Sequence, residues 1–344
     1  MFLSLPNEFH VPIRFINKDI LEFNEVFFNF RQAPIGVSLP LQQEERWIKD
    51  LEAMKQRAKE IGVSLDVRLA RDENEQKAQV DELIMKGSIG VLIIAAINPL
   101  AFESLVDKAH KSNIKVIAYD RLIKNSDLDL YITFNNERVG ELQGRYLIEK
   151  VPKGNYIILS GDPEDNNAKL VKEGAMAFIN PLVTLRDIKI VTDKAVDNWD
   201  PKIAYGFVKE ALIANKNSVN AVLAPNDDIA GGAIDALKEQ GLAGKVAVTG
   251  QDADFQAIRR IIEGTQSMTV FKDTRELGKV AIESAKKLAL GEAIDSTDTI
   301  NNGKTDVQSI FISPTLVTKD NLVQILINSG YLKKEDVYGK NNLK

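Results

Sequence analysis

Residues 35–69 read IGVSLPLQQEERWIKDLEAMKQRAKEIGVSLDVRL, and this stretch decides the fold class. The apolar run Ile35 to Leu39 has the length of a buried strand, and Ser64 to Leu69 is a second strand candidate. Between them, apolar residues recur every three or four positions, as on one face of an amphipathic helix: Trp47, Leu51, Met54, Ala58 and Ile61. Gly62 can end that helix. The stretch therefore predicts two parallel strands joined by a helix.

The same alternation of strand and helix patterns continues along the chain. A first unit is completed by the helix near Gln76 to Lys86, the strand Val91 to Ala96, a helix opened by Pro99 and the strand Ile114 to Tyr119. After a helix over Arg138 to Glu149, a second unit contains the strands Tyr156 to Ser160, Ile188 to Val191, Ala221 to Ala224, Val246 to Thr249 and Ser267 to Val270. Its helices begin at Ala168, Pro201, Ile229 and Phe255, and the helix Glu276 to Leu290 and the strand Ile310 to Ile312 are left over. This rhythm predicts an α/β protein with two doubly wound parallel sheets.

The composition excludes several classes of function. The formal charge is −5 with no block of Lys and Arg that could neutralise a row of phosphates, so no nucleic-acid partner is expected. There is no cysteine, which excludes disulfides and thiolate catalysis and suits an oxidising compartment. The only histidines are His10 and His110, and we expect His110 to be a surface residue of a helix. The sequence therefore has almost no histidine for a Ser/His/Asp triad or for a multi-histidine metal site.

Polar residues and both tryptophans follow the predicted strands. They are Glu45-Arg46-Trp47, Asp120-Arg121, Asp165-Asn166-Asn167, Asn198-Trp199, Asn226-Asp227-Asp228, Gln251-Asp252 and Phe271-Lys272. Any one of these groups could be an ordinary turn or helix cap. Because parallel sheets bind ligands beyond the carboxyl ends of their strands, the groups together predict one site. Carboxylates, cationic donors and flat aromatic rings suit the hydroxyls and the C–H face of a neutral polyhydroxylated ligand.

Two patterns that are typical of dehydrogenases do not support an oxidoreductase. Residues 244–250, GKVAVTG, and the Tyr205-x-x-x-Lys209 pair resemble parts of a short-chain dehydrogenase. However, Asp252 and Asp254 follow where a phosphate-binding turn needs more glycines, and Tyr205 precedes that turn in the chain. The carboxylates at Asp227, Asp228, Asp252 and Asp254 are explained better as ligand contacts than as hydrolytic groups. We therefore expect no enzyme activity, no catalytic residue, no cofactor and no metal.

The strand-end motifs resemble the D-xylose-binding proteins of bacterial ABC transporters, which belong to the ribose/galactose-binding cluster of periplasmic binding proteins. The resemblance covers about residues 34 to 335. It is carried by Glu-Arg-Trp at 45–47, Ala-Tyr-Asp-Arg at 118–121, Asp-Asn-Asn-Ala-Lys-Leu at 165–170, Gly-Gln-Asp-Ala-Asp at 250–254 and Thr-Val-Phe-Lys at 269–272. It implies a type I periplasmic binding protein in which three hinge strands join two lobes and the sugar binds between them. The implied lobes are residues 34–137 plus 274–308 and residues 138–273 plus 309–337.

The resemblance also implies a role for each residue of the site. Trp47 and Trp199 would stack on the sugar ring, while its hydroxyls would bond to Arg46, Asp120, Arg121, Asp165, Asn167, Asn226, Asp252 and Lys272. The chain departs from the family at Asn135-Asn136, where Asp-Asn is expected, and at Pro225, where Ser is usual. Both departures lie beside the implied hinge or site and leave the sugar assignment intact.

Residues 1–33 fit neither lobe and contain seven of the fourteen phenylalanines. They are too polar for the core of a signal peptide, so we expect any export signal to have been removed or replaced. The segment is interpreted either as a tag remnant or strap, or as a docking or membrane-proximal segment. The expected location is extracytoplasmic, in the periplasm or at the outer face of the cell membrane. The expected partner is an ABC permease or, alternatively, a membrane histidine kinase, whereas a repressor would need a longer basic segment before the first strand.

Overall fold

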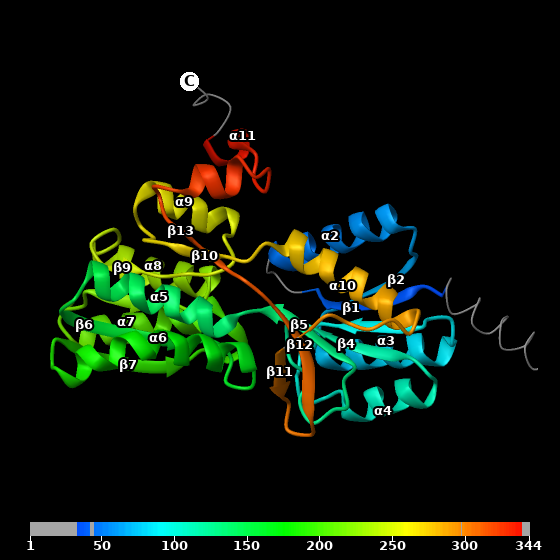
Figure 1. The fold of residues 1–344 in the computed structure, drawn as a ribbon. Helices are drawn as coiled ribbons and strands as arrows, with labels where there is room; N and C mark the ends of the chain where they lie inside the picture. Colours follow the sequence, from blue (N-terminus) through cyan, green and yellow to red (C-terminus); the bar gives the residue numbers. More distant parts are fainter. Residues whose placement is uncertain (1–32, 42–44, 297, 339–344) are drawn as a thin grey trace, which may run out of the picture.

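The computed structural model describes residues 33–41, 45–296 and 298–338, which form two lobes (Figure 1). Residues 1–32, for which the sequence analysis left two interpretations open, lie outside the described residues, and of the Phe-rich segment only Ala33 is described. Within the described ranges, no helix is both long enough and apolar enough to cross a membrane.

The first lobe is built on a seven-stranded sheet in the order β11-β12-β5-β4-β3-β1-β2. Its strands are β1 (Ile35–Pro40), β2 (Leu65–Ala70), β3 (Val91–Ile94), β4 (Lys115–Tyr119), β5 (Leu130–Phe134), β11 (Asp298–Asn301) and β12 (Asp306–Ile312). All neighbouring strands are parallel except β11 and β12. The strand order reverses between β1 and β3, so the loops that follow these strands leave a crevice at the carboxyl edge of the sheet.

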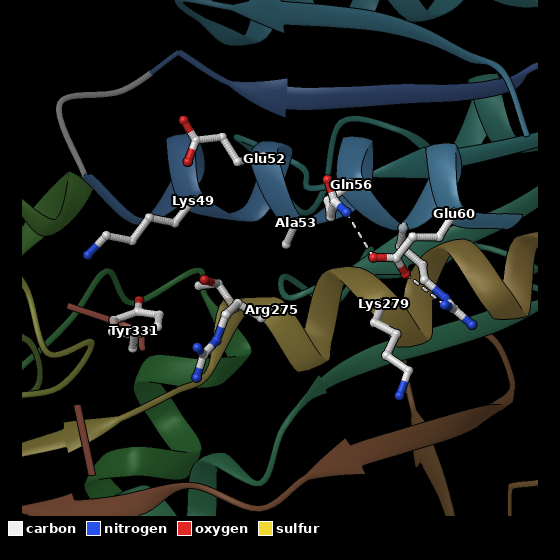
Figure 2. A pocket seen from close by; sticks show the side chains of 10 residues that line it. Lys49, Glu52, Ala53, Gln56, Glu60, Arg275, Lys279 and Tyr331 are labelled. Carbon is white, nitrogen blue, oxygen red and sulfur yellow. Dashed lines mark hydrogen bonds and ion pairs between the residues drawn. The ribbon is translucent and has the colours of Figure 1, made fainter. Parts of the chain in front are cut away.

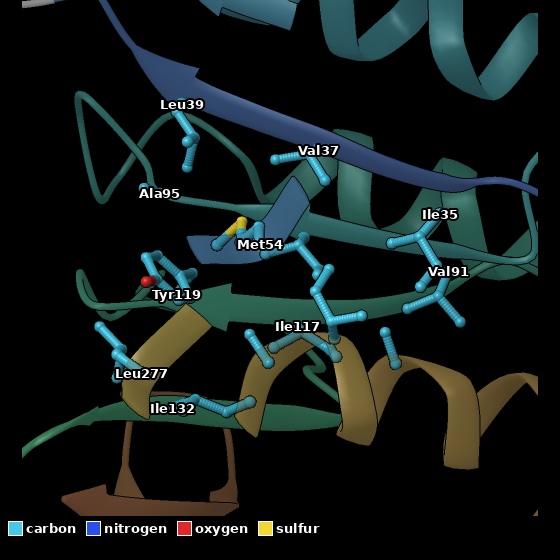
Figure 3. Packing of buried hydrophobic residues seen from close by; sticks show 14 of the residues in the cluster. Ile35, Val37, Leu39, Met54, Val91, Ala95, Ile117, Tyr119, Ile132 and Leu277 are labelled. Carbon is cyan, nitrogen blue, oxygen red and sulfur yellow. The ribbon is translucent and has the colours of Figure 1, made fainter. Parts of the chain in front are cut away.

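Helices cover both faces of this sheet. They are α2 (Glu45–Ile61), α3 (Glu73–Lys86), α4 (Glu103–Lys111) and α10 (Thr274–Ala289). Helices α2 and α10 bury one face, where Met54 and Leu277 pack against Val37 and Tyr119 (Figure 3). The expectation that Pro99 opens α4 was wrong, because the helix begins only at Glu103. His110 lies on α4, as expected, and its Nε2 is 2.9 Å from Asp129 Oδ2.

The second lobe has a four-stranded parallel sheet in the order β7-β6-β8-β9. Its strands are β6 (Gly154–Ser160), β7 (Ile188–Ala195), β8 (Ala221–Leu223) and β9 (Ala247–Val248). Its helices are α5 (Asn136–Lys150), α6 (Asn166–Thr184), the short η1 (Asp197–Trp199), α7 (Pro201–Ala214), α8 (Asp227–Glu239) and α9 (Phe255–Glu263). Apolar side chains from α7 and α8 pack on one face of the sheet, and Ala175 and Ile179 of α6 on the other.

The strand expected to complete the second sheet has another partner. Strand β10 (Thr269–Phe271) pairs antiparallel with β13 (Thr315–Val317) in a separate two-stranded sheet. It still borders the end of β9, since Val270 N donates to Gly250 O at 3.0 Å. The π-helix η2 (Val323–Ile327) and α11 (Lys334–Tyr338) follow β13 and close this end of the lobe.

The chain crosses between the lobes three times, after β5, after β10 and after β12 (Figure 1). Residues 309–312 were expected in the second lobe, but they pair with Tyr131 to Phe134 in the first sheet. The third crossing therefore lies after Ile312, because β12 can satisfy its backbone groups only while it remains beside β5. We propose lobes of residues 34–135 plus 274–312 and 136–273 plus 313–338.

Candidate functional site

A small cavity lies between the lobes at the carboxyl ends of the strands. All ten residues predicted from the sequence line it: Arg46, Trp47, Asp120, Arg121, Asp165, Asn167, Trp199, Asn226, Asp252 and Lys272. The structure thus brings every predicted residue to one place, and their role in binding stays a prediction.

Both lobes contribute walls to the cavity. From the first lobe, Arg46 and Trp47 begin α2, and Asp120 and Arg121 follow β4. From the second lobe come the loops after β6, β7, β8, β9 and β10, which carry Asp165, Asn167, Trp199, Asn226, Asp252 and Lys272. The doubly wound topology explains this gathering, because it points the carboxyl ends of both sheets at the crevice.

Two cavity residues also cap helices. Asp165 Oδ1 accepts a hydrogen bond from Asn167 N at 2.9 Å at the start of α6, and Asn226 Oδ1 accepts one from Ile229 N at 3.0 Å at the start of α8. The other oxygen of Asp165 lies 3.7 Å from Arg121 Nε. Each capping hydrogen bond fixes the rotamer of the side chain that makes it. The same bond therefore keeps the side chains of Asp165 and Asn226 in place at the cavity wall.

The charges around the cavity balance. Arg46, Arg121 and Lys272 supply three positive charges, and Asp120, Asp165 and Asp252 supply three negative ones. Lys272 Nζ lies 2.9 Å from Asp252 Oδ1, and Arg46 Nη2 lies 3.0 Å from Asp120 Oδ1. Because buried charges are costly unless they are paired, this balance favours a neutral ligand over a phosphate or a carboxylate.

Burial and neighbouring charges oppose each other at these carboxyls. Burial alone would raise the pKa of Asp120, but the charges of Arg46, Lys272 and Arg121 outweigh it and hold the pKa below its usual value. At Asp165, burial dominates and raises the pKa, although Arg121 partly offsets it. Asp120 is therefore an ionised acceptor over the whole neutral range.

Five buried polar atoms of the lining residues have no hydrogen-bond partner within the described part of the protein: Arg46 Nη2, Trp47 Nε1, Asp120 Oδ1, Gln251 Oε1 and Asp252 Oδ1. Three of these atoms are nevertheless in ion pairs, Arg46 Nη2 with Asp120 Oδ1 at 3.0 Å and Asp252 Oδ1 with Lys272 Nζ at 2.9 Å. Buried polar groups in native proteins nearly always find partners. Trp47 Nε1, a donor, and Gln251 Oε1, an acceptor, have neither a hydrogen bond nor an ion pair within the described residues and are thus available to a hydroxylated ligand.

Backbone strain is concentrated around the cavity. Five of the ten described non-glycine residues with positive φ lie there: Asp120, Asn198, Trp199, Asp252 and Ala253. The φ of Trp199 is 57°, which is rare for so bulky a side chain. Such conformations cost about 1 to 3 kcal/mol each and persist where the surroundings hold them, often at ligand clamps.

Two functional positions escaped the sequence analysis. Gln251 was noted after a strand but was not assigned to the site, and it lines the cavity. Asp50 lies behind the cavity, where it accepts hydrogen bonds from Tyr119 Oη at 2.5 Å and from Arg46 Nε at 3.3 Å. Burial raises the pKa of Asp50 to about 6, with Arg46 lowering it in part. The i,i+4 spacing of Arg46 and Asp50 on α2 was the signal available for this pair.

Other polar groups singled out in the sequence have structural roles. The carboxylate of Asp227 accepts hydrogen bonds from Gln266 Nε2 at 2.7 Å and Thr269 Oγ1 at 2.9 Å, outside the cavity. Tyr205 and Lys209 lie on α7 and bond to each other at 2.8 Å, and Tyr205 Oη also donates to Glu239 Oε1. The apparent dehydrogenase pair is thus a helix-surface contact.

A larger hollow of about 490 Å³ lies elsewhere, between α2 and α10 (Figure 2). Side chains of helix surfaces line most of it, and Tyr331 stands at one end. Three of its charged groups are in ion pairs, since Arg57 pairs with Glu60 at 2.8 Å and Arg275 with Asp273 at 2.7 Å. It lacks the strand ends and the tryptophans of the smaller cavity, so the smaller cavity is the candidate site.

Comparisons with known proteins agree with this geometry. The family model described as a periplasmic binding protein domain matches residues 35–293. The D-xylose-binding periplasmic protein of Haemophilus influenzae is 43% identical over 309 residues, which cover 90% of this chain and 93% of that protein. The D-xylose-binding periplasmic protein of Escherichia coli K12 is 42% identical over 308 residues, or 89% of this chain and 93% of its own.

A solved structure shows the same architecture. The carbohydrate transporter solute-binding protein from Chloroflexus aurantiacus, in complex with D-glucose, superposes with a TM-score of 0.83 at 33% identity. The match covers 88% of this chain and 97% of that one.

Proposed function

This chain belongs to the periplasmic binding protein family, and we propose that it binds D-xylose outside the cytoplasm and presents it to an ABC uptake transporter. It is a solute-binding protein and not an enzyme. Two relatives that share more than two fifths of their residues with it are named for D-xylose.

One observation carries the proposal. A small cavity between two lobes combines three cations, three carboxylates and both tryptophans of the chain, and five of its buried polar atoms make no hydrogen bond within the described protein. Sugar hydroxyls both donate and accept, and the C–H face of a pyranose stacks on an indole. Charge-assisted hydrogen bonds contribute roughly 1.5 to 3 kcal/mol each, so a few of them support about micromolar affinity, near −8 kcal/mol.

Calorimetry and fluorescence test the sugar directly. We expect D-xylose to bind at about micromolar Kd or tighter. It should also change the tryptophan emission, because Trp47 and Trp199 both line the cavity. D-glucose should bind less tightly, since a cavity fitted to a pentose has little room for an added hydroxymethyl group. A titration to millimolar D-xylose with no heat and no spectral change would refute the proposal.

The indole ring of Trp199 packs directly against the backbone of Gly161. A Cβ on residue 161 would lie 2.2 Å from Cη2, 2.3 Å from Cζ2 and 2.4 Å from Cζ3 of Trp199. Gly161→Ala should therefore push the indole into the cavity, and overpacking of this kind costs roughly 1 to 3 kcal/mol. We expect the calorimetric affinity for D-xylose to fall by about tenfold or more.

The second-site variant Trp199→Phe separates steric displacement from general damage. Phenylalanine lacks the ring atoms that meet the new methyl group, so Gly161→Ala/Trp199→Phe should bind D-xylose no worse than Trp199→Phe alone. Gly206→Ala is the matched control, since a Cβ there meets nothing within 4 Å. Equal losses from Gly161→Ala in both backgrounds would show that Gly161 does not act through Trp199.

The downstream partner needs a separate experiment. A pull-down with and without D-xylose would offer the protein an ABC permease and, in a parallel arm, the periplasmic domain of a sensor histidine kinase. We expect sugar-dependent retention by the permease. Retention by the kinase domain alone would replace transport with sensing and leave the sugar assignment unchanged.

A further inference from the structure

The guanidinium of Arg46 faces three carboxylates. Its Nη2 lies 3.0 Å from Asp120 Oδ1, and its Nη1 lies 3.7 Å from Asp252 Oδ1. Its Nε donates to Asp50 Oδ2 at 3.3 Å. Asp120 follows β4 of the first lobe and Asp252 follows β9 of the second, so Arg46 contacts both walls of the cavity. Because the guanidinium is planar and its donors form a rigid fork, the group that fixes Nε also decides where the two Nη groups point.

Of these three carboxylates, Asp50 is the one behind the cavity. Asp120 and Asp252 line the cavity, where a sugar hydroxyl can use them as acceptors. Asp50 is fully buried and does not line the cavity. It lies four residues after Arg46 on α2, and side chains at this spacing meet on one face of a helix. Asp50 can therefore hold Arg46 without occupying space at the cavity wall.

Tyr119 in turn holds Asp50. Tyr119 Oη donates to Asp50 Oδ1 at 2.5 Å, and its ring packs among the apolar side chains beneath α2 (Figure 3). Tyr119 is the last residue of β4 and directly precedes Asp120. The strand that carries a cavity carboxylate thus also fixes, through Asp50, the guanidinium that faces this carboxylate. A buried chain of satisfied hydrogen bonds rigidifies the groups that it joins.

The charge of Asp50 balances the attraction of the cavity carboxylates for Arg46. Opposite charges at these distances attract strongly where water is excluded. If Asp50 were neutral, Asp120 and Asp252 would attract the guanidinium further into the cavity. The three groups would then satisfy one another instead of a ligand. The position of Arg46 that leaves its donors to a hydroxylated ligand therefore depends on an ionised Asp50.

We propose that Asp50 is a positioning residue for sugar binding, which holds Arg46 at the cavity wall through its charge and is itself held by Tyr119. The inference rests on the proposed function, because Arg46 acts on the sugar and Asp50 acts only through Arg46. The sugar affinity then depends on the protonation of a group that lies outside the cavity.

The pH range of this dependence follows from the surroundings of Asp50. Burial raises its pKa to about 6, although Arg46 and the hydrogen bond from Tyr119 lower it in part and the charge of Asp120 raises it. Tyr331 of the second lobe also lies close enough for the charge of Asp50 to raise the pKa of its hydroxyl, which stays neutral in this range. Binding needs the ionised carboxylate, so the sugar affinity should be highest above about pH 6 and should fall as the pH drops through this value.

Calorimetry of D-xylose binding to the full chain, from about pH 5 to pH 8, tests this role. D-xylose has no group that titrates in this range, so the profile reports the protein. Because a group with a pKa of about 6 is about nine-tenths protonated at pH 5, the Kd of the wild type should rise about tenfold between pH 8 and pH 5. Asp50→Asn keeps the shape of the side chain without its charge. It should weaken binding at pH 8 by about tenfold or more and show a flatter profile.

The profile of Asp50→Asn is compared with that of the wild type, because other groups can titrate as well. Asp165 lines the cavity, and burial raises its pKa too. Asp129→Asn is the matched control. Asp129 accepts hydrogen bonds from Val116 N and Lys115 Nζ, at 2.8 Å each, beside the start of β4, whereas Tyr119 ends this strand. This control should leave the Kd within about threefold of the wild type at each pH.

Tyr119→Phe supplies a second, independent measurement. It leaves the charge of Asp50 in place and removes a hydrogen bond that lowers the pKa of this carboxyl. The midpoint of the pH profile should therefore move upward. A role of Asp50 in packing alone would leave the midpoint where it is in the wild type. This variant decides the question if a melting curve shows that Asp50→Asn does not fold.

The outcomes separate this inference from the proposed function. Folded Asp50→Asn that binds D-xylose within about threefold of the wild type at pH 8 overturns the positioning role alone. Weaker binding with the pH profile of the wild type overturns it as well, since the loss is then structural. A wild-type Kd that stays constant from pH 5 to pH 8, or an unmoved midpoint in Tyr119→Phe, has the same consequence. A wild type that does not bind D-xylose at any pH overturns the proposed function and this inference with it.

Discussion

Replacing Arg121 by alanine should lower the affinity for D-xylose by at least about 30-fold. The Arg121 side chain is 8% exposed, its Nε lies 3.7 Å from Asp165 Oδ2, and its guanidinium carbon lies 5.3 Å from the centre of the Trp47 ring. Removing it leaves Asp165 buried without its cation and exposes one face of Trp47. Truncating one member of a buried charged pair costs about 2 to 5 kcal/mol.

Calorimetry on the folded variant checks this result. Arg145→Ala is the matched control, because Arg145 is an exposed arginine on α5 whose partner is Glu149 and its loss should not affect the sugar. A melting curve shows whether each variant is folded. If folded Arg121→Ala binds D-xylose within about threefold of the wild type, Arg121 does not belong to the site.

The sequence predicted those features of the fold that depend on neighbouring residues in the chain. The periodicity over residues 35–69 predicted β1, α2 and β2 to within a few residues, because strands and helices bury apolar faces at their own periods. The strand ends pointed to the region of the candidate site, since the fold directs the carboxyl ends of its strands at the crevice, but the resemblance to the sugar-binding family chose the ten residues among the strand-end groups.

Features that depend on distant contacts were not predictable. Asp50 and Tyr119 are 69 residues apart, and nothing in either local sequence reveals their hydrogen bond. The packing of Trp199 against Gly161 likewise joins two loops. Strand β12 was expected to leave the first lobe at residue 309, but its pairing with β5 carries it to Ile312, and β5 itself was not predicted.

D-xylose should also shift the protein from an open to a closed arrangement of its lobes. In this structure the lobes already touch across the cavity, since Asn167 Nδ2 donates to Asp120 O at 2.9 Å and Arg46 Nη1 lies 3.7 Å from Asp252 Oδ1. A ligand that contacts both walls binds this arrangement better than one in which the walls are apart. A preference of about 5.5 kcal/mol is enough to move the populations from 1:99 to 99:1.

Small-angle scattering measures this shift as a fall in the radius of gyration at saturating D-xylose. The three crossings between the lobes are short, so rotation about them can occur with each lobe remaining rigid. Asn167→Ala removes contacts between the lobes that need no sugar, including the bond from Tyr131 Oη at 3.1 Å. The variant should therefore be more open without sugar and should close only at higher D-xylose concentration.

This variant also resolves the case in which the wild type shows no change. A sugar-free protein that is already closed would give a constant radius of gyration, but Asn167→Ala would then be larger without D-xylose and would shrink when the sugar is added. A radius that stays constant in both proteins contradicts the closure mechanism. In that case the sugar would be held without any differential affinity between two arrangements of the lobes, and it could not signal its presence to a transporter through their closure.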